Sequence, residues 1–125
     1  MAASSKRIEV SLSRKRLTYF EDDEEVDWFH CVIGADNKTK KGTFSVLLKD
    51  KDKVSRKYGA PMPWSLKFSS DYKAIHGTGF ALVRSFAQWA GVDSVGSHGC
   101  VGLSNDNAKT LYKWADVGTP IIIKK

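Results

Sequence analysis

A cysteine flanked by glycines, with a histidine upstream of it, is the part of this sequence whose residue types are suited to chemistry. The stretch is Ser97-His98-Gly99-Cys100-Val101-Gly102-Leu103, and His76-Gly77-Thr78 precedes it. Cysteine acyl transfer requires a thiol, a base, and small residues that let a substrate carbonyl group approach the backbone. The sequence therefore predicts that Cys100 is a nucleophile.

Two histidines are candidates for the base. His76 ends an apolar run and precedes Gly77, whereas His98 lies two residues from Cys100. Positions two apart share one face of a strand, so His98 is able to contact the thiol. A base that lies on its own strand is positioned independently of the nucleophile, which favours His76. Geometry decides between the two histidines.

The residues around Cys100 suggest how its reactivity would be raised. The N–H groups of Gly99 and Cys100 are suited to an oxyanion hole, although Gly99 also fits a turn that requires a positive φ. A polar helix start follows the cysteine, and a nearby helix N-terminus would lower the pKa of the thiol. The alternative is a buried structural cysteine, which does not require glycines on both sides.

A metal site is a second use of these side chains. Potential ligands occur at His76, His98, Cys100 and the pair His30-Cys31. Their spacing matches no common zinc pattern, so no metal is expected. His30 is instead expected to pack in or near the core. Cys31 is expected to remain a lone thiol, because a nucleophilic Cys100 must stay free.

Composition indicates one globular domain of 125 residues, with a flexible segment at 1–6 and the domain at 7–125. No apolar run approaches the roughly 20 residues of a membrane span. The first residues lack the apolar core of a signal peptide, so the chain is either cytoplasmic or the mature part of an exported precursor. The net charge of +6 accompanies no recognised nucleic-acid motif, so no nucleic-acid partner is expected.

Hydrophobic periodicity predicts a mainly β fold with a helix near the C-terminus. Strands are predicted at 7–12, 17–20, 26–33, 42–48, 65–68, 72–76 and 119–123. A helix capped by Ser104 and stopped by Gly118 is predicted at 104–114, and a second short helix at 80–90. Turns or loops are predicted at 13–16, 21–25, 34–41, 50–57 and 61–64.

The Ser97–Val101 element and the upstream His76-Gly77 resemble the signature of the L,D-transpeptidase (YkuD) family, a histidine followed by a spacer and Ser/Thr-His-Gly-Cys. The similarity extends from about Lys6 to Lys124. It includes the segments at 39–44, 61–68 and 111–123. The resemblance implies a β-sandwich of mixed sheets with a helix packed near the C-terminus.

The resemblance also implies roles for individual residues. Cys100 would be the nucleophile and His76 its base, and the carbonyl group of Gly77 would orient the imidazole. The residues that would shape the site, hold the oxyanion or bind substrate are Ser97, His98, Gly99, Trp64 and Gly102. Gly102 stands where the family usually has arginine or asparagine, and Trp64 replaces the usual tyrosine. The segment at 80–90 is expected to form a lid or a partner surface.

The implied reaction is ping-pong acyl transfer on peptidoglycan stem peptides, with release of the terminal D-alanine and formation of 3→3 cross-links. Carbapenems would be expected to acylate Cys100, no metal or cofactor is implied, and a periplasmic or wall-associated location is expected. Three alternatives stay open: an L,D-carboxypeptidase that uses water as the acceptor, a non-catalytic wall-binding module, and a basic nucleic-acid binder. Steep weakening of binding by salt would identify the last.

Overall fold

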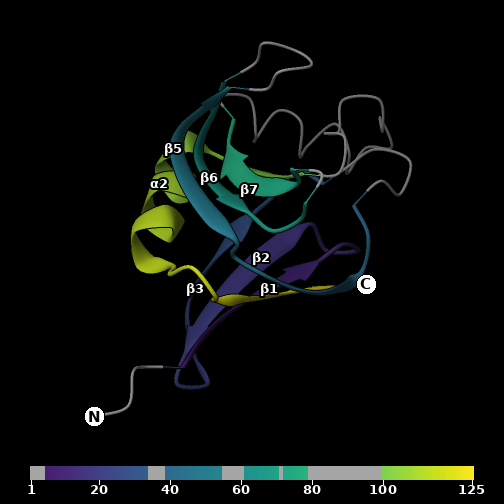
Figure 1. Ribbon diagram of the computed structural model, residues 1–125. Coiled ribbons are helices and arrows are strands. Elements are labelled where there is room, and N and C mark those ends of the chain that lie inside the picture. The colour runs from purple at the N-terminus through teal and green to yellow at the C-terminus, as the bar shows by residue number, and fades with distance from the viewer. Residues whose placement is uncertain (1–4, 34–38, 55–60, 71, 79–99) are drawn as a thin grey trace.

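Two mixed β-sheets and one helix make up the described part of the chain. The structure is a computed structural model, and it describes residues 5–33, 39–54, 61–70, 72–78 and 100–125 (Figure 1). The first sheet has the order β3-β2-β1-β9-β4, and the second has the order β5-β6-β7-β8. Among these residues, no helix is long and apolar enough to cross a bilayer. The fold class predicted from the sequence is confirmed.

The strand bounds define the two sheets. The first sheet consists of β1 (Lys6–Ser11), β2 (Arg16–Glu21), β3 (Glu24–His30), β4 (Gly42–Ser45) and β9 (Pro120–Lys124). The second consists of β5 (Leu48–Val54), β6 (Pro61–Lys67), β7 (Ala74–Gly77) and β8 (Val101–Leu103). Strand β1 pairs parallel to β9, and β7 pairs parallel to β8, while the other pairs are antiparallel.

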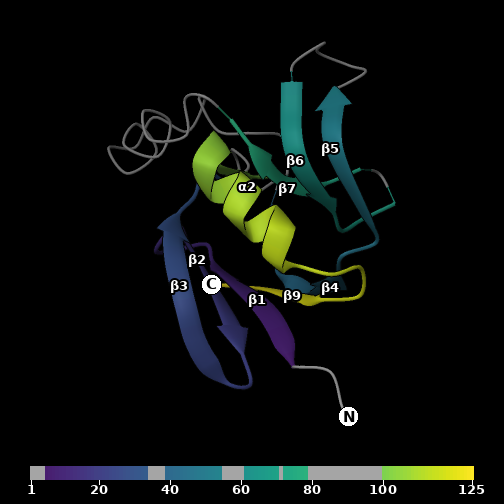
Figure 2. The same ribbon diagram turned by 90° about the vertical axis from the view of Figure 1, so that its left-hand side faces the viewer.

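Helix α2 (Asn105–Trp114) joins the two sheets into one core. It packs against β6, β7 and β8 (Figures 1 and 2). Its last turn reaches the first sheet, where the rings of Trp114 and Tyr19 have centroids 4.9 Å apart. The fully buried side chains come from both sheets and from the helix, and include Ile8, Val10, Leu17, Leu66, Ile75, Val101, Leu103, Leu111 and Ile121.

The N-terminal hairpin follows from its alternating sequence. Ile8 and Val10 point into the core from β1, and β2 pairs with β1 over its whole length. The next turn is made by Asp22 and Asp23, both with positive φ, which matches the right-handed twist of a tight hairpin. The acidic run predicted as a turn is thus a two-residue turn between β2 and β3. Strand β1 begins at Lys6, one residue before the expected boundary of the domain.

Two predicted loops are strands. A charged loop is predicted at 50–57, but residues 50–54 belong to β5. This strand lies at the edge of the second sheet, where charged side chains are exposed to solvent. The segment Pro61–Trp64, also predicted as a loop, is the first half of β6. Prolines are tolerated there because β7 pairs with β6 at Leu66 and Lys67, which leaves one side of the earlier residues outside that ladder.

The predicted strand at 42–48 is divided between the sheets. Strand β4 ends at Ser45, and the chain then crosses to the second sheet at Val46 and Leu47. The Val46 N–H donates to the carbonyl oxygen of Thr119, just before β9 of the first sheet, at 3.0 Å. The Leu47 N–H donates to the carbonyl oxygen of Lys67, in β6 of the second sheet, at 2.7 Å. The change of partner explains why one continuous apolar run gives two strands.

The helix prediction is confirmed at its start. The Ser104 hydroxyl accepts a hydrogen bond from the Asn107 N–H at 3.2 Å, and Asp106 lies in the first turn. The helix ends at Trp114, and Ala115 already has an extended backbone, so Gly118 does not stop it. Gly118 instead adopts φ +95° in the turn before β9. The helix predicted at 80–90 lies outside the described residues.

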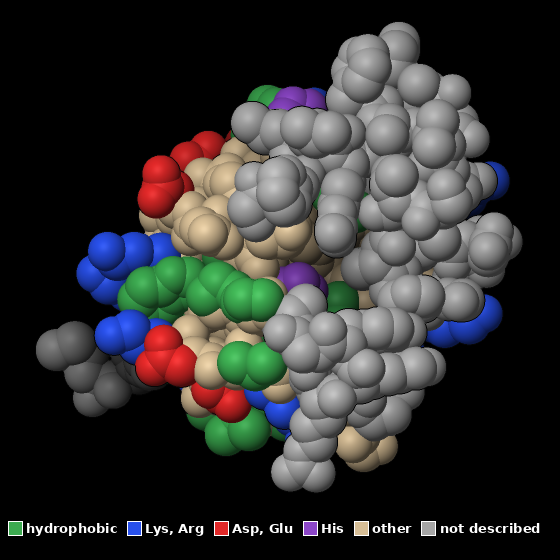
Figure 3. Space-filling view, turned by 90° about the horizontal axis from the view of Figure 1, so that it is seen from above, with side chains coloured by type: hydrophobic (Ala, Val, Ile, Leu, Met, Phe, Trp, Pro, Cys, Tyr) green, Lys and Arg blue, Asp and Glu red, His purple; other side chains and the backbone are tan. Residues whose placement is uncertain are grey.

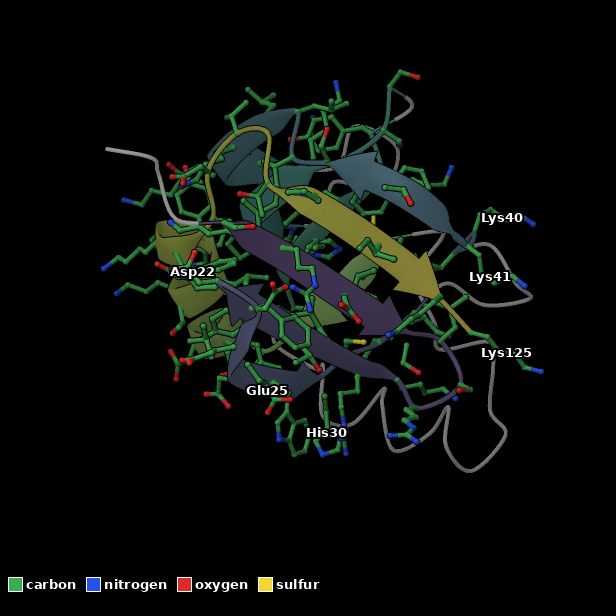
Figure 4. All side chains as sticks on the ribbon, turned by 90° about the horizontal axis from the view of Figure 1, so that it is seen from below. Asp22, Glu25, His30, Lys40, Lys41 and Lys125 are labelled. Atoms are coloured by element: carbon green, nitrogen blue, oxygen red, sulfur yellow. The ribbon has the colours of Figure 1, made fainter. Side chains whose placement is uncertain are left out.

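His30 is not in the core. It ends β3 on the solvent-exposed side and projects outward (Figure 4). Its ring meets Trp28 edge to face, with centroids 5.1 Å apart. Cys31, the next residue, is fully buried. The expectation of a core histidine is wrong because the strand's alternation buries its neighbours Phe29 and Cys31 instead.

Candidate active site

His76 is held in the centre of a buried strand. Strand β7 is buried along its length, and His76 is 8% exposed. Its Nδ1 lies 2.8 Å from the carbonyl oxygen of Gly77. Because a carbonyl oxygen only accepts, Nδ1 must carry the proton, and in a neutral ring Nε2 is then the acceptor. This is the tautomer that a general base requires.

The parallel register of β7 and β8 places Cys100 near His76. Ile75 pairs with Val101 and His76 with Gly102, so the same register aligns Cys100 with Ala74. Alternation puts His76 and Cys100 on one face of the sheet, in neighbouring diagonal positions. Such diagonal neighbours lie about 7–8 Å apart, within reach of a long or aromatic side chain. Cys100 is partly exposed, as a nucleophile must be.

Helix α2 lies on the other face of the second sheet. A Cβ atom on Gly77 would approach Asn105 Oδ1, in the first turn of α2, at 2.7 Å. Gly77 therefore points at the helix, and His76 points away from it. Strand β8 separates Cys100 from that first turn by three residues, about 10 Å of extended chain. The effect of the helix end on the Cys100 thiol therefore stays a prediction.

Backbone contacts from distant segments fix both sides of β8. Val32 and Gly102 exchange two backbone hydrogen bonds of 2.8 Å, which attach β8 to the segment after β3. The hydroxyl of Thr39, itself buried, donates to the carbonyl oxygen of Cys100 at 3.5 Å. Thr39 was not predicted as a site residue. A single threonine in a polar segment carries no signal of such a contact.

The glycine at position 102 is explained by packing. A Cβ atom there would lie 3.0 Å from Thr78 Cγ2 and 3.6 Å from Val32 Cβ. Thr78 shares a face with His76, and its methyl group occupies the space into which a side chain at position 102 would project. The substrate-binding role predicted for Gly102 stays a prediction. The contacts show that a larger residue would have to displace Thr78.

Trp64 belongs to β6, and its ring packs against α2. It has φ +57°, which is uncommon for a bulky residue. Its ring meets Tyr112 of α2 edge to face, at 5.3 Å between centroids, and the ammonium groups of Lys51 and Lys109 lie 5.4 and 5.7 Å from the ring centroid. This is the side of the sheet to which Gly77 points. The geometry gives Trp64 a packing role and does not bring it to the face that carries Cys100.

The remaining predicted site residues lie outside the described part of the chain. These are Ser97, His98 and Gly99. The choice of His76 over His98 as the base stays a prediction. Among the described residues, no three His, Cys, Asp or Glu side chains converge as metal ligands would. In the view from above, small areas of histidine side chain are exposed next to hydrophobic side chains, and Lys or Arg side chains lie at the outer edge of the molecule (Figure 3).

The two cysteines are expected to differ sharply in reactivity. Cys31 is fully buried, and burial raises the pKa of its thiol to about 12, whereas Cys100 is partly exposed. Because the thiolate is the reactive form, we expect iodoacetamide at pH 8 to modify Cys100 and to spare Cys31. Peptide mass mapping of the folded protein checks this. Equal labelling of both thiols would contradict the described burial.

Replacing Gly77 with alanine is expected to destabilise the protein by about 1–3 kcal/mol, the usual cost of overpacking. The added methyl group would meet Asn105 Oδ1 at 2.7 Å and the Asn105 Cα atom at 3.3 Å. Thermal unfolding measures the effect. In the Asn105→Ala background the nearest contact is gone, so the same substitution should cost less. Equal costs in both backgrounds would show that Asn105 is not the limiting contact.

Comparison with known proteins gives one consistent family. The family model described as "YkuD: L,D-transpeptidase catalytic domain" matches residues 5–123. A curated protein, "Probable L,D-transpeptidase 3" of Mycobacterium tuberculosis (strain ATCC 25618 / H37Rv), is 34% identical over 95 residues, which cover 70% of this chain and 34% of that protein. The chain thus spans about a third of the length of this curated relative.

Solved structures show the same fold. An L,D-transpeptidase from Stackebrandtia nassauensis superposes with a TM-score of 0.82 at 24% identity, over 98% of this chain and 56% of that one. L,D-transpeptidase 3 from Mycobacterium tuberculosis, solved in complex with a faropenem-derived adduct, gives a TM-score of 0.79 at 21% identity, over 98% of this chain and 61% of that one. At these identities the likeness is one of fold.

Proposed function

Because the chain belongs to the family of YkuD L,D-transpeptidase catalytic domains, we propose that it is a cysteine acyltransferase acting on peptidoglycan stem peptides. One observation carries the chemistry. The imidazole of His76 is held through Nδ1 by the Gly77 carbonyl group, on the face of the sheet where the register of β7 and β8 places Cys100. This arrangement leaves Nε2 as the basic nitrogen for the thiol.

The proposed first half-reaction forms a thioester. His76 Nε2 takes the proton of the Cys100 thiol, and the sulfur attacks the carbonyl carbon of the third stem residue. The bond to the terminal D-alanine breaks, and that amino acid leaves with the proton from His76. The N–H groups of Gly99 and Cys100 are proposed to hold the negative oxygen of the tetrahedral intermediate.

The second half-reaction restores the enzyme. A side-chain amine of a neighbouring stem attacks the thioester carbonyl, the carbon–sulfur bond breaks, and the thiol regains its proton through His76. The product is a 3→3 cross-link. With water as the acceptor, the same site would release a tripeptide and act as an L,D-carboxypeptidase.

Two further expectations follow from this proposal. Carbapenems should acylate Cys100, and the relative solved in complex with a faropenem-derived adduct supports this expectation. A peptidoglycan substrate also requires a periplasmic or wall-associated location, which we propose for this chain.

The test is mass spectrometry of a disaccharide-tetrapeptide incubated with the protein. A dimer that has lost one D-alanine supports transpeptidation, and a tripeptide monomer alone supports carboxypeptidation. Cys100→Ala should give neither product, while Cys31→Ala, which removes the other thiol, should give the wild-type product. An unchanged substrate with the wild-type protein would argue against the proposal and favour a wall-binding module, which a peptidoglycan sedimentation assay detects.

A further inference from the structure

Tyr72 occupies an unusual position beside the candidate site. It lies in the connection between β6 and β7, with a positive φ of 56°. Its N–H donates to the Ser69 carbonyl oxygen at 3.1 Å, and the Phe68 N–H donates to the Lys73 carbonyl oxygen at 2.9 Å. A left-handed backbone is disfavoured for an aromatic residue, and such strain persists where the surrounding structure imposes it. The backbone of this connection therefore fixes the position of the Tyr72 Cα atom and the direction in which its side chain leaves the backbone.

The ring of Tyr72 lies over the face of the sheet that carries Cys100. Lys67 pairs with Ala74, and its ammonium group is 5.2 Å from the centroid of the Tyr72 ring. The ammonium group of Lys53 lies 4.2 Å from the same centroid. Since Ala74 is the residue that the register aligns with Cys100, the row Lys67, Ala74, Cys100 lies on the face of the sheet from which the Lys67 ammonium group reaches this ring.

The hydroxyl group of Tyr72 is buried and has no hydrogen-bond partner among the described residues. A buried hydroxyl without a partner is costly, and native structures rarely keep one without a reason. Besides burial, the Asp50 carboxylate raises the pKa of this hydroxyl through its charge and through a side-chain hydrogen bond, although the contact falls outside the geometry of a well-formed hydrogen bond. The hydroxyl thus has a donor that no described acceptor holds in a well-formed hydrogen bond.

The electrostatic surroundings keep this hydroxyl protonated. Burial, and after it the nearby Asp50 carboxylate and Cys100, raise the pKa of Tyr72 to about 12. At neutral pH the group is therefore an O–H donor and not a phenolate. The contribution of Cys100 also indicates that the sulfur and the hydroxyl are close enough to interact, in agreement with the register.

We propose that Tyr72 is a catalytic residue whose hydroxyl donates a hydrogen bond to the carbonyl oxygen that Cys100 attacks. This inference rests on the proposed acyl transfer. A substrate oxygen would supply an acceptor in the geometry that Asp50 does not provide. As the carbonyl oxygen becomes an oxyanion, the hydrogen bond strengthens, so the interaction stabilises the transition state more than the bound substrate.

The test compares two tyrosine hydroxyl deletions. Tyr72→Phe is expected to lower kcat for tetrapeptide turnover about 100-fold, at the low end of the loss on removing one oxyanion donor. Tyr112→Phe removes the same atom on α2, on the other face of the sheet, and should keep wild-type turnover. Because the deleted Tyr72 hydroxyl has no partner, Tyr72→Phe should not lower the melting temperature. A lowered melting temperature with unchanged kcat would assign Tyr72 a structural role and overturn the proposal.

A second readout separates an effect on the substrate from one on the thiol. The exchange of Cys100 with a dithiodipyridine disulfide involves no carbonyl group, so Tyr72→Phe should leave its rate and pH profile unchanged. An equal slowing of disulfide exchange and turnover would place the hydroxyl's action on the sulfur and overturn the proposal. If wild-type protein turns over substrate and Tyr72→Phe matches it, this inference alone fails. If wild-type protein has no turnover, the proposed function fails and takes this inference with it.

Discussion

Cys100→Ala is expected to lower turnover by about 10⁴-fold or more, because no other described side chain on that face can form the thioester. The cysteine is partly exposed and precedes β8, whose backbone contacts with Val32 and whose own core residues are untouched by the change. Folding should therefore be preserved. Turnover is measured by release of D-alanine, and folding by thermal unfolding of the same preparation.

Cys31→Ala is the matched control for this prediction. It removes the same atom from a fully buried position, so it should cost stability, by about 1–2 kcal/mol for a small cavity, and leave kcat unchanged. The two substitutions thus have opposite signatures. Residual turnover by Cys100→Ala near the wild-type rate would exclude Cys100 as the nucleophile.

His76→Ala is expected to lower kcat by about 10²–10⁴-fold, the range for loss of a general base. Its Nδ1 contact with Gly77 is lost together with the basic nitrogen. We expect His98→Ala to cost less, because a base held in a buried strand is positioned more rigidly than one next to the nucleophile. The measurement is single-turnover acylation of Cys100 followed by mass spectrometry.

The base assignment has a clear contrary result. A greater loss with His98→Ala than with His76→Ala would make His98 the base. As a check on the mechanism, raising the pH should partly restore acylation in His76→Ala, since hydroxide then replaces the base in forming the thiolate. No recovery at alkaline pH would point to a role for His76 in positioning rather than in proton transfer.

Local patterns in the sequence predict the elements whose structure is determined locally. Strict alternation gives the β1–β2 hairpin, and the cap at Ser104 gives the start of α2. The elements that were missed depend on pairing with another strand and not on a pattern of their own. The charged residues of β5 and the prolines of β6 form strands because they pair with each other, and no pattern within either segment shows this.

In the candidate site, too, some features follow from local sequence and others depend on how separate segments pair. The types and spacing of His76, Gly77 and Cys100 indicate the chemistry, and the contact of His76 with Gly77 is the one that the family resemblance implies. The common face of His76 and Cys100 depends on a parallel register between residues more than twenty positions apart. No sequence pattern points to Tyr72. Its proposed role depends on the burial of its hydroxyl group without a well-formed hydrogen bond, which only the folded structure shows.

The two hydrogen bonds between Val32 and Gly102 link β8, the strand that follows Cys100, to the segment after β3. Strand β8 has three residues and would be a weak element if it were attached to β7 alone. Its second attachment makes the site part of the same cooperative unit as the first sheet. Amide exchange at Gly102 should then require opening of both sheets, so the site loses its order when the whole domain unfolds and not before.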